Sequence, residues 1–223
     1  MFVFVMRMAL SLRNILWLSL AYAGLASAQT RLAGLYEKGM SSPRDLRKAL
    51  FWYKKTASKG DLDAQLCLGR LYEEGDGVPQ DFSEAFKWYF RSAELGDAWA
   101  QNTVGYMYGI GRGVEKNHEL AIEWYKKAAK KGHVWAFMNM GWAYYDGLGV
   151  PQDFNLANEW YTKASDQGLP QAQYNLGLMY ADGLGVGKDY SAATELLQKA
   201  YDGGVQDAKK SLNIVKAKIT GKY

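Results

Sequence analysis

Apolar residues in the middle of the chain recur at helical spacing. Between residues 98 and 110 they lie at Ala100, Val104, Met107 and Tyr108, positions that share one face of a helix. The sequence Gly111-Arg112-Gly113-Val114 follows, and two glycines one residue apart favour a tight turn. We therefore expect a helix over 98–110 that ends at this turn.

A second apolar stripe follows the turn. Over residues 117–130 it comprises Leu120, Ala121, Trp124, Tyr125 and Ala128, and Gly132 then ends the helix as a C-terminal glycine. The two segments predict a helix–turn–helix hairpin. Neither helix can bury its stripe alone, so hairpins of this kind must stack on one another.

The pattern repeats every 36 residues from Gln29 to Gly204, with no insertion or deletion. A fixed period of this length indicates an array of one structural unit. Small residues recur inside the helices, which suggests close approach between helices, and alternate with large aromatic positions. The recurring positions are Ala33, Gly69, Gly105, Gly141 and Gly177; Ala64, Ala100, Ala136, Ala172 and Ala208; and Trp52-Tyr53, Trp88-Tyr89, Trp124-Tyr125 and Trp160-Tyr161.

The period divides the chain into five repeats and a cap. We place the repeats at 29–60, 61–96, 97–132, 133–168 and 169–204, and a capping helix and tail at 205–223. The first repeat is truncated at its start and has the turn Gly39-Met40-Ser41-Ser42-Pro43 in place of Gly-x-Gly. The cap carries apolar residues on one face of Val205–Ile219 and lysines elsewhere, as the exposed end of an array requires.

The first 28 residues have the pattern of a secretory signal peptide. Arg7 and Arg13 precede an apolar run from Ile15 to Leu25, and Ala26-Ser27-Ala28 closes it with small residues. The run is too short for a comfortable membrane span. We expect cleavage after Ala28, an exported protein in the periplasm or outside the cell, and no stable membrane span after cleavage.

Charge and cysteine content narrow the class of partner. The formal net charge of the chain is +4, and it falls to +2 without Arg7 and Arg13. Such a balance gives no broad basic surface, which argues against nucleic acid as a partner. The single cysteine, Cys67, cannot form an internal disulfide, so packing alone must stabilise the exported chain.

The repeat resembles the Sel1-like repeat, a relative of the tetratricopeptide repeat. The resemblance rests on Ala172-Gln173-Tyr174-Asn175-Leu176-Gly177, Met179-Tyr180, Gly183-Leu184-Gly185-Val186, Asp189, Ala193 and the second-helix pattern Trp160-Tyr161-x-Lys163-Ala164. It covers nearly all of residues 29–219. The 36-residue period and the Gly-x-Gly turn favour the Sel1 type over the 34-residue tetratricopeptide type.

The resemblance implies an all-α fold, a right-handed α/α superhelix of about five hairpins and a C-terminal capping helix. Such proteins act as adaptors that bind proteins or peptides on the inner, concave surface. Exported bacterial members look like envelope scaffolds, regulators of periplasmic signalling or host-contact factors. One subgroup has a disulfide in each repeat and is linked to β-lactam binding; this chain, with Cys67 alone, departs from that pattern.

No set of residues in the sequence points to catalysis, a metal or a cofactor. The only histidines, His118 and His133, are expected to be surface residues without a role, because a catalytic site needs several convergent groups. Two histidines and one cysteine fall short of a structural zinc set. The Gly-x-Gly turns lack the lysine of a phosphate-binding loop. We therefore expect a protein that is not an enzyme.

Positions that do not repeat suggest where a partner binds. One face of the first helices is half charged in repeat two, with Asp63, Leu66, Arg70 and Glu73, but rich in aromatic residues in repeats three to five. Exposed apolar patches mark interaction sites, and Trp and Tyr often anchor them. We predict that a partner peptide or protein segment binds on the concave face to Trp99, Asn102, Tyr106, Trp135, Met138, Trp142, Tyr145, Tyr174 and Leu178.

Two alternatives stay open. Neighbouring helices could cover some of these aromatic positions, because buried Trp and Tyr are ordinary core residues. The chain could also be a periplasmic cell-wall-binding protein, or a hydrolase of the β-lactam- or peptidoglycan-related Sel1-like group, with aromatic rings stacked on a glycan. A cleft with paired carboxylates or an activated nucleophile would favour the enzyme.

Overall fold

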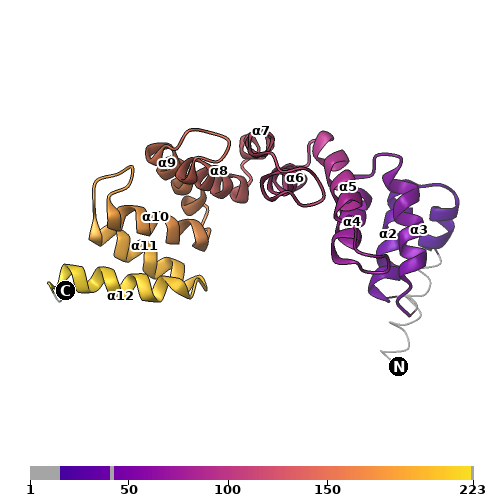
Figure 1. The fold of residues 1–223 in the computed structure, drawn as a ribbon. Coiled ribbons are helices and arrows are strands. Elements are labelled where there is room, and N and C mark those ends of the chain that lie inside the picture. Colours follow the sequence, from indigo (N-terminus) through magenta and orange to yellow (C-terminus); the bar gives the residue numbers. More distant parts are fainter. Residues whose placement is uncertain (1–15, 41–42, 222–223) are drawn as a thin grey trace, which may run out of the picture. The chain divides into compact units, whose positions relative to one another are not determined.

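A computed structural model describes residues 16–40 and 43–221, and these contain helices and no strand. Figure 1 shows the helices following one another along the chain. Their bounds are α2 Ala26–Lys38, α3 Leu46–Ala57, α4 Leu62–Glu74, α5 Phe82–Glu94, α6 Ala98–Ile110, α7 His118–Lys130, α8 Val134–Asp146, α9 Phe154–Asp166, α10 Pro170–Asp182, α11 Tyr190–Asp202 and α12 Asp207–Ile219. The expected all-α solenoid of hairpins is confirmed.

The chain divides into two compact units. Unit 1 contains residues 1–100 and 111–115, and unit 2 contains residues 101–110 and 116–223. Unit 1 therefore holds the hairpins α2–α3 and α4–α5, while unit 2 holds α8–α9, α10–α11, α7 and α12. Most of α6 belongs to unit 2, but its first turn, with Trp99, belongs to unit 1.

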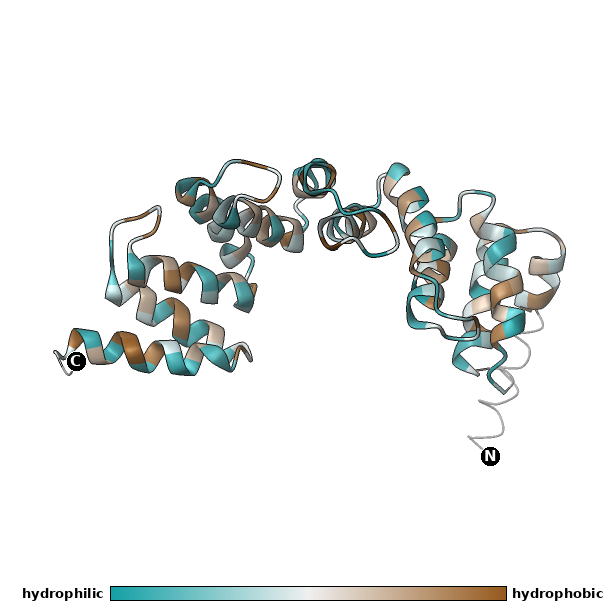
Figure 2. Cartoon of the chain, viewed as in Figure 1, coloured by the Kyte–Doolittle hydropathy of each residue, from teal (hydrophilic) through white to brown (hydrophobic). Residues whose placement is uncertain are grey.

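Local sequence signals set the helix ends. An Asp or Asn side chain caps each second helix by accepting a hydrogen bond from a backbone N–H in the first turn, as Asp153 does from Leu156 at 3.0 Å. The first helix of a hairpin ends at a glycine in the left-handed conformation, as α8 does at Gly147 with φ of +71°. Figure 2 shows hydrophobic and hydrophilic residues mixed along these helices, which bury one face each.

Each recurring glycine lies against a large side chain of the second helix in the same hairpin. A Cβ atom built on Gly69 would lie 2.3 Å from the ring of Tyr89, and one on Gly141 would lie 2.5 Å from the ring of Tyr161. Both tyrosines are fully or almost fully buried. The predicted close approach of helices is therefore a contact between a glycine backbone and a tyrosine ring, and an alanine there would push the helices apart.

The second glycine of each turn has a different neighbour. Gly185 follows α10, has φ of +66°, and would place a Cβ atom 2.1 Å from the backbone oxygen of Phe154, at the start of α9 in the preceding hairpin. Gly149 meets the start of α7 in the same way, 2.5 Å from the backbone of His118. These glycines thus link successive repeats, in addition to making the turn.

The repeat extends further toward the N-terminus than the sequence suggested. Residues 16–22 are helical, and the fully buried Ala21 accepts a hydrogen bond from the Gln29 side-chain amide at 2.8 Å. Gln65, one period later, donates to Ala57 in the same way at 3.1 Å. Gly24 has positive φ and precedes Gly60 by one 36-residue period. Residues 16–22 therefore occupy the place of a second helix before α2.

Three further observations concern the segment expected to be a signal peptide. Residues 1–15, with Arg7 and Arg13, lie outside the described residues, as do Ser41 and Ser42 of the first turn. Ala28 is buried within α2, so cleavage after it would remove the first three residues of this helix. In the part of the chain that the structure describes, every helix is too short or too polar to cross a membrane.

The role of the turn glycines can be tested at Gly185. We expect Gly185→Ala to lower the free energy of unfolding by more than about 1 kcal/mol, because φ is positive there and the added methyl group meets Phe154. Gly187→Ala is the matched control, since nothing lies within 4 Å of a Cβ atom at that position. Urea unfolding followed by circular dichroism would measure both; equal stability of the two variants would contradict the assignment.

Candidate functional site

The nine expected contact residues divide between the two units. Trp99 belongs to unit 1, where its ring packs edge-on against Tyr89 with centroids 5.4 Å apart. The other eight residues belong to unit 2 and lie on three first helices, α6, α8 and α10. We call the surface formed by these eight the first-helix face: Asn102, Tyr106, Trp135, Met138, Trp142, Tyr145, Tyr174 and Leu178.

Three aromatic residues of the first-helix face are accessible to a partner. Tyr106 is 40% exposed, Trp135 is 48% exposed and Trp142 is 39% exposed. Tyr145 is half-buried because its ring packs edge-on against Phe154, with centroids 5.3 Å apart. Large exposed aromatic side chains on one face are the usual anchors of protein binding.

Other residues of the face contact the next first helix instead. Asn102 accepts a hydrogen bond from the Asn139 amide at 2.9 Å. The Asn175 amide lies 3.8 Å from the Met138 sulfur, and the Tyr174 and Ser211 hydroxyls are 3.5 Å apart. Some side chains of the face are therefore exposed, and others join neighbouring repeats.

A hollow of about 280 Å³ opens on the first-helix face between α8, α9 and α10. We call it the α8–α10 hollow. Three of the expected residues, Trp142, Tyr145 and Leu178, line it. The remaining lining residues, which the sequence reasoning missed, are Asp146, Tyr161 and Asn175. Tyr161 was assigned to packing alone, and no pattern in the sequence shows that Leu178 leaves space beside it.

The hollow has a polar floor and one carboxylate at its rim. Burial raises the pKa of Tyr161, a hydrogen bond with Asn175 opposes that rise, and the charge of Asp146 adds to it. The tyrosine thus stays a neutral phenol near neutral pH. Asp146 is exposed, and its carboxylate forms no ion pair within the described residues.

The equivalent hollow one repeat earlier is closed. It is lined by Gly109, Tyr125, Asn139, Trp142 and their neighbours, and its volume is only about 10 Å³. Trp142 lies 36 residues before Leu178, so the two residues occupy equivalent positions in the two hollows. The smaller leucine side chain therefore leaves open a space that an indole ring occupies in the preceding repeat.

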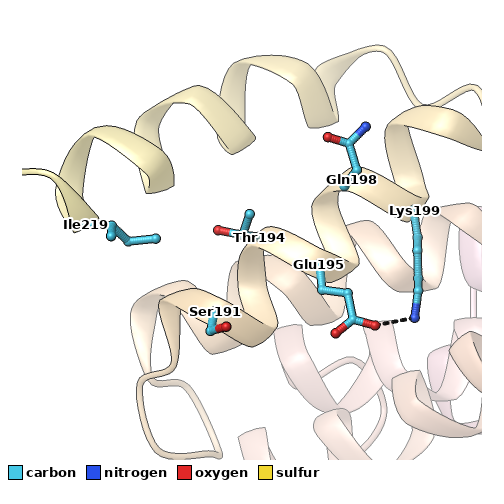
Figure 3. A pocket seen from close by; sticks show the side chains of 6 residues that line it. All are labelled: Ser191, Thr194, Glu195, Gln198, Lys199 and Ile219. Carbon is cyan, nitrogen blue, oxygen red and sulfur yellow. Dashed lines mark hydrogen bonds and ion pairs between the residues drawn. The ribbon is translucent and has the colours of Figure 1, made fainter.

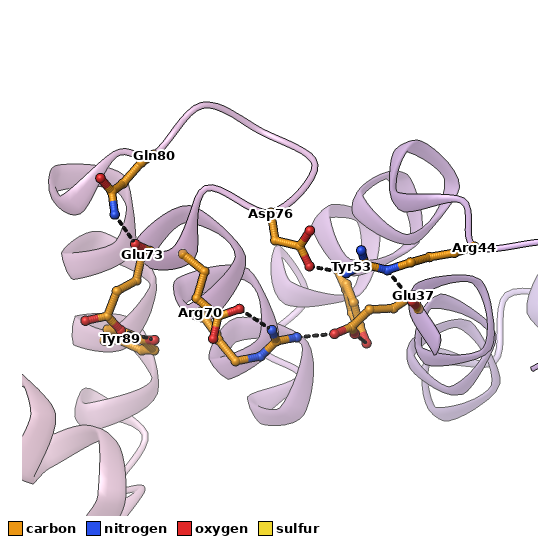
Figure 4. Close-up of polar contacts among 9 residues, drawn as sticks. Glu37, Arg44, Tyr53, Arg70, Glu73, Asp76, Gln80 and Tyr89 are labelled. Carbon is orange, nitrogen blue, oxygen red and sulfur yellow. Dashed lines mark hydrogen bonds and ion pairs between the residues drawn. The ribbon is translucent and has the colours of Figure 1, made fainter. Parts of the chain in front are cut away.

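In unit 1 the equivalent position is occupied by a charged side chain of the protein itself. Arg70, which is 72 residues before Trp142 and 108 before Leu178, forms an ion pair with Glu37 of the preceding first helix. Glu37 also accepts a hydrogen bond at 2.7 Å from Tyr53, the equivalent of Tyr161 (Figure 4). Figure 4 also shows the next tyrosine, Tyr89, bound to Glu73 at 2.9 Å.

A larger hollow of about 790 Å³ lies between α11 and the end of α12. Figure 3 shows Thr194 and Gln198 on the side of α11 toward α12, and the ion pair between Glu195 and Lys199. Its lining contains no aromatic residue, and its two charged groups pair with each other at 2.6 Å. It therefore offers a partner fewer anchors than the first-helix face.

The groups considered for chemistry do not come together. His118 begins α7 and His133 precedes α8 in unit 2, whereas Cys67 lies in α4 of unit 1. Both histidines are half-buried. Burial raises the pKa of the Cys67 thiol, which keeps it protonated and weakly nucleophilic.

No metal site is present among residues 16–40 and 43–221, where no three His, Cys, Asp or Glu side chains converge. The arrangement of the site thus offers aromatic surfaces, amides and one carboxylate. Such groups bind and orient a ligand.

Comparison with known proteins gives the family. The model of the Sel1 repeat matches five segments, at residues 26–61, 62–97, 100–133, 138–169 and 170–205. The chain therefore belongs to the Sel1 repeat family, as its residues predicted. Proteins of this family are generally scaffolds for protein–protein interaction rather than enzymes.

Solved structures agree with this assignment. A protective antigen of uropathogenic Escherichia coli that displays an SLR fold is 33% identical, with a TM-score of 0.87 over 92% of this chain and 44% of that one. A Sel1 repeat protein from Oxalobacter formigenes is 34% identical, with a TM-score of 0.79 over 84% of this chain and 74% of that one. This chain thus spans less than half the length of the E. coli antigen. A comparison with curated proteins found no match.

The buried tyrosines predict loss of stability at alkaline pH. Burial raises the pKa of Tyr53, Tyr89, Tyr125 and Tyr161 above the value of about 10 in an unfolded chain. Above pH 10 the unfolded chain therefore loses protons that the folded chain keeps. The free energy of unfolding should keep its full value below pH 10. Above that pH it should fall by about 1.4 kcal/mol per pH unit for each such tyrosine.

Urea unfolding between pH 8 and about 11 would measure this loss, because this range includes the pKa of about 10 of tyrosine in an unfolded chain. Tyr125→Phe keeps the ring but removes the ionisable group, so its stability should fall less steeply with pH than that of the unmodified chain. Tyr201→Phe, at a half-buried position on α11, is the control. The same pH dependence in all three proteins would contradict the argument.

Proposed function

We propose that this protein is an exported, non-enzymatic scaffold that holds a segment of a partner protein on the first-helix face of unit 2. The observation that carries the proposal is the exposure of Tyr106, Trp135 and Trp142 on successive first helices. An exposed Trp costs solubility unless a partner covers it, and buried Trp and Tyr rings give large binding energies.

The contrast with the second helices supports this assignment. Trp88, Trp124 and Trp160 lie beside a cationic side chain of their own helix, for example Lys127 at 3.6 Å from the Trp124 ring. Trp135 and Trp142 have no such contact with a described residue. The Trp residues of the second helices are thus covered by the chain itself, whereas those of the first-helix face are available.

The binding role can be tested with Trp135→Ala. The side chain is 48% exposed, so the free energy of unfolding should change by less than about 1 kcal/mol. Peptides selected from a displayed library on the intact protein should bind the variant more weakly by about 2 kcal/mol, roughly thirtyfold. Isothermal titration calorimetry would measure the affinity, and thermal unfolding would measure the stability.

Phe51→Ala is the control, because Phe51 is an apolar residue of α3 that is 60% exposed and lies outside the first-helix face. It should leave peptide affinity unchanged. Equal loss of affinity in both variants would show non-specific apolar binding. A library that yields no binding peptide, or peptides that ignore Trp135, would contradict the proposed function.

Export is supported by the sequence of the first 28 residues, with two arginines, an apolar run and Ala26-Ser27-Ala28. We expect N-terminal sequencing of the protein from a periplasmic or culture-medium fraction to begin at Gln29. Cleavage would also remove Ala21 and its hydrogen bond to Gln29. A protein that keeps residues 16–28 in its native host would contradict export by this signal, and those residues would then cap unit 1.

A further inference from the structure

We propose that the α8–α10 hollow binds an arginine side chain of the partner. The proposal rests on the proposed function, because the arginine belongs to the segment held on the first-helix face. It adds a chemical identity for one residue of that segment and a position at which it is recognised.

The lining of the hollow suits a guanidinium group. Asp146 supplies an exposed carboxylate, and Trp142 and Tyr145 supply aromatic rings. Asn175 and Tyr161 add polar atoms at the floor. A guanidinium is planar, stacks on aromatic rings and donates several hydrogen bonds at once, so it can use all three kinds of group. A neutral apolar side chain would use only the rings.

The chain contains an internal example of this binding mode. In unit 1 the guanidinium of Arg70 occupies the equivalent position and pairs with Glu37, which also accepts the hydrogen bond from Tyr53. Arg70 is contributed by the following first helix, and Leu178 stands at that position in the α8–α10 hollow. In the α8–α10 hollow the tyrosine is kept as Tyr161, and Tyr145 stands in the place of Glu37. The next residue, Asp146, supplies the carboxylate, and the arginine is absent.

Size agrees with this assignment. The hollow that Trp142 fills has a volume of about 10 Å³. The α8–α10 hollow, which has Leu178 at the equivalent position, has a volume of about 280 Å³. At the position of Leu178, the protein itself places the guanidinium of Arg70 in unit 1 and the indole of Trp142 one repeat earlier in unit 2. Of these three residues, Leu178 is the one that leaves room for a side chain from another molecule.

The charges around the hollow favour a cation. Helices α8 and α10 contain no Lys or Arg, and each ends with an aspartate, Asp146 and Asp182. The lysines of α7, α9 and α11 lie on second helices, and two of them, Lys127 and Lys163, contact tryptophan rings of their own helices. An arginine that enters the hollow therefore meets the carboxylate of Asp146 and uncovered aromatic rings.

The probe for the test is the blocked tripeptide acetyl-Gly-Arg-Gly-amide, compared with the same tripeptide containing citrulline, which is neutral and of nearly the same shape. We expect the arginine peptide to shift the NMR signals of the Trp142 indole and the Asn175 side-chain amide in a saturable way. The citrulline peptide should produce shifts only at much higher concentration, because it lacks the charge that pairs with Asp146.

Three variants test the assignment. Asp146→Asn should weaken binding of the arginine peptide about fivefold or more, since it removes a charge-assisted hydrogen bond. Asp182→Asn is the matched control: it removes the carboxylate one repeat later, which does not line the hollow, and should leave affinity unchanged. Leu178→Arg should place the guanidinium of the protein itself in the hollow, as Arg70 does in unit 1, and abolish binding of the peptide.

Each outcome decides the proposal. Equal binding of the arginine and citrulline peptides, or unchanged affinity in Asp146→Asn, would overturn recognition of a cation. Binding of acetyl-Gly-Leu-Gly-amide in preference to the arginine peptide would assign the hollow to an apolar side chain. If neither charged nor apolar tripeptides bind while library peptides still depend on Trp135, this inference fails and the proposed function stands. If library peptides also fail to bind, both the arginine site and the proposed function are contradicted.

Discussion

The structure depends on one close contact, which three hairpins share: a glycine of the first helix lies against a tyrosine ring of the second helix. Gly69 and Gly141 lie so close to Tyr89 and Tyr161 that a methyl group would not fit. A glycine inside a helix costs about 1 kcal/mol relative to alanine. The burial of a whole tyrosine ring offsets this cost, and the contact sets the distance between the two helices of a hairpin.

The tyrosine that packs on this glycine also forms the floor of the candidate site. Its ring is buried in the core, while its hydroxyl lies near the position that is Arg70, Trp142 or Leu178 in different repeats. In unit 1 that position contains the Arg70–Glu37 ion pair; in unit 2 it contains Trp142 in one repeat and an open hollow beside Leu178 in the next. A rigid repeated element thus supports sites of different chemistry, because only the residues around the hydroxyl change.

In unit 2 the first and second helices of a hairpin differ in the side chains that they carry. The second helices α7 and α9 carry lysines, and Lys127 and Lys163 cover the tryptophan rings of their own helices. First helices of unit 2 carry amides that join neighbouring repeats, and aromatic residues that no lysine covers. This division fits the scaffold role that is general in the Sel1 repeat family.

The sequence predicted the hairpins, their period, the family and the helix bounds of the third repeat, because helical spacing, capping residues and glycines act locally or between adjacent hairpins. It also placed Trp142, Tyr145 and Leu178 on one face. Packing between helices, which no local pattern shows, decided three other features. Tyr145 packs on Phe154, Asn102 and Met138 contact the next first helix, and residues 16–22 contact α2. Packing also decided that Tyr161 and Asp146 share a hollow with Leu178. These outcomes depend on how side chains from several helices fill the space between them. The spacing of apolar residues along one helix does not show this.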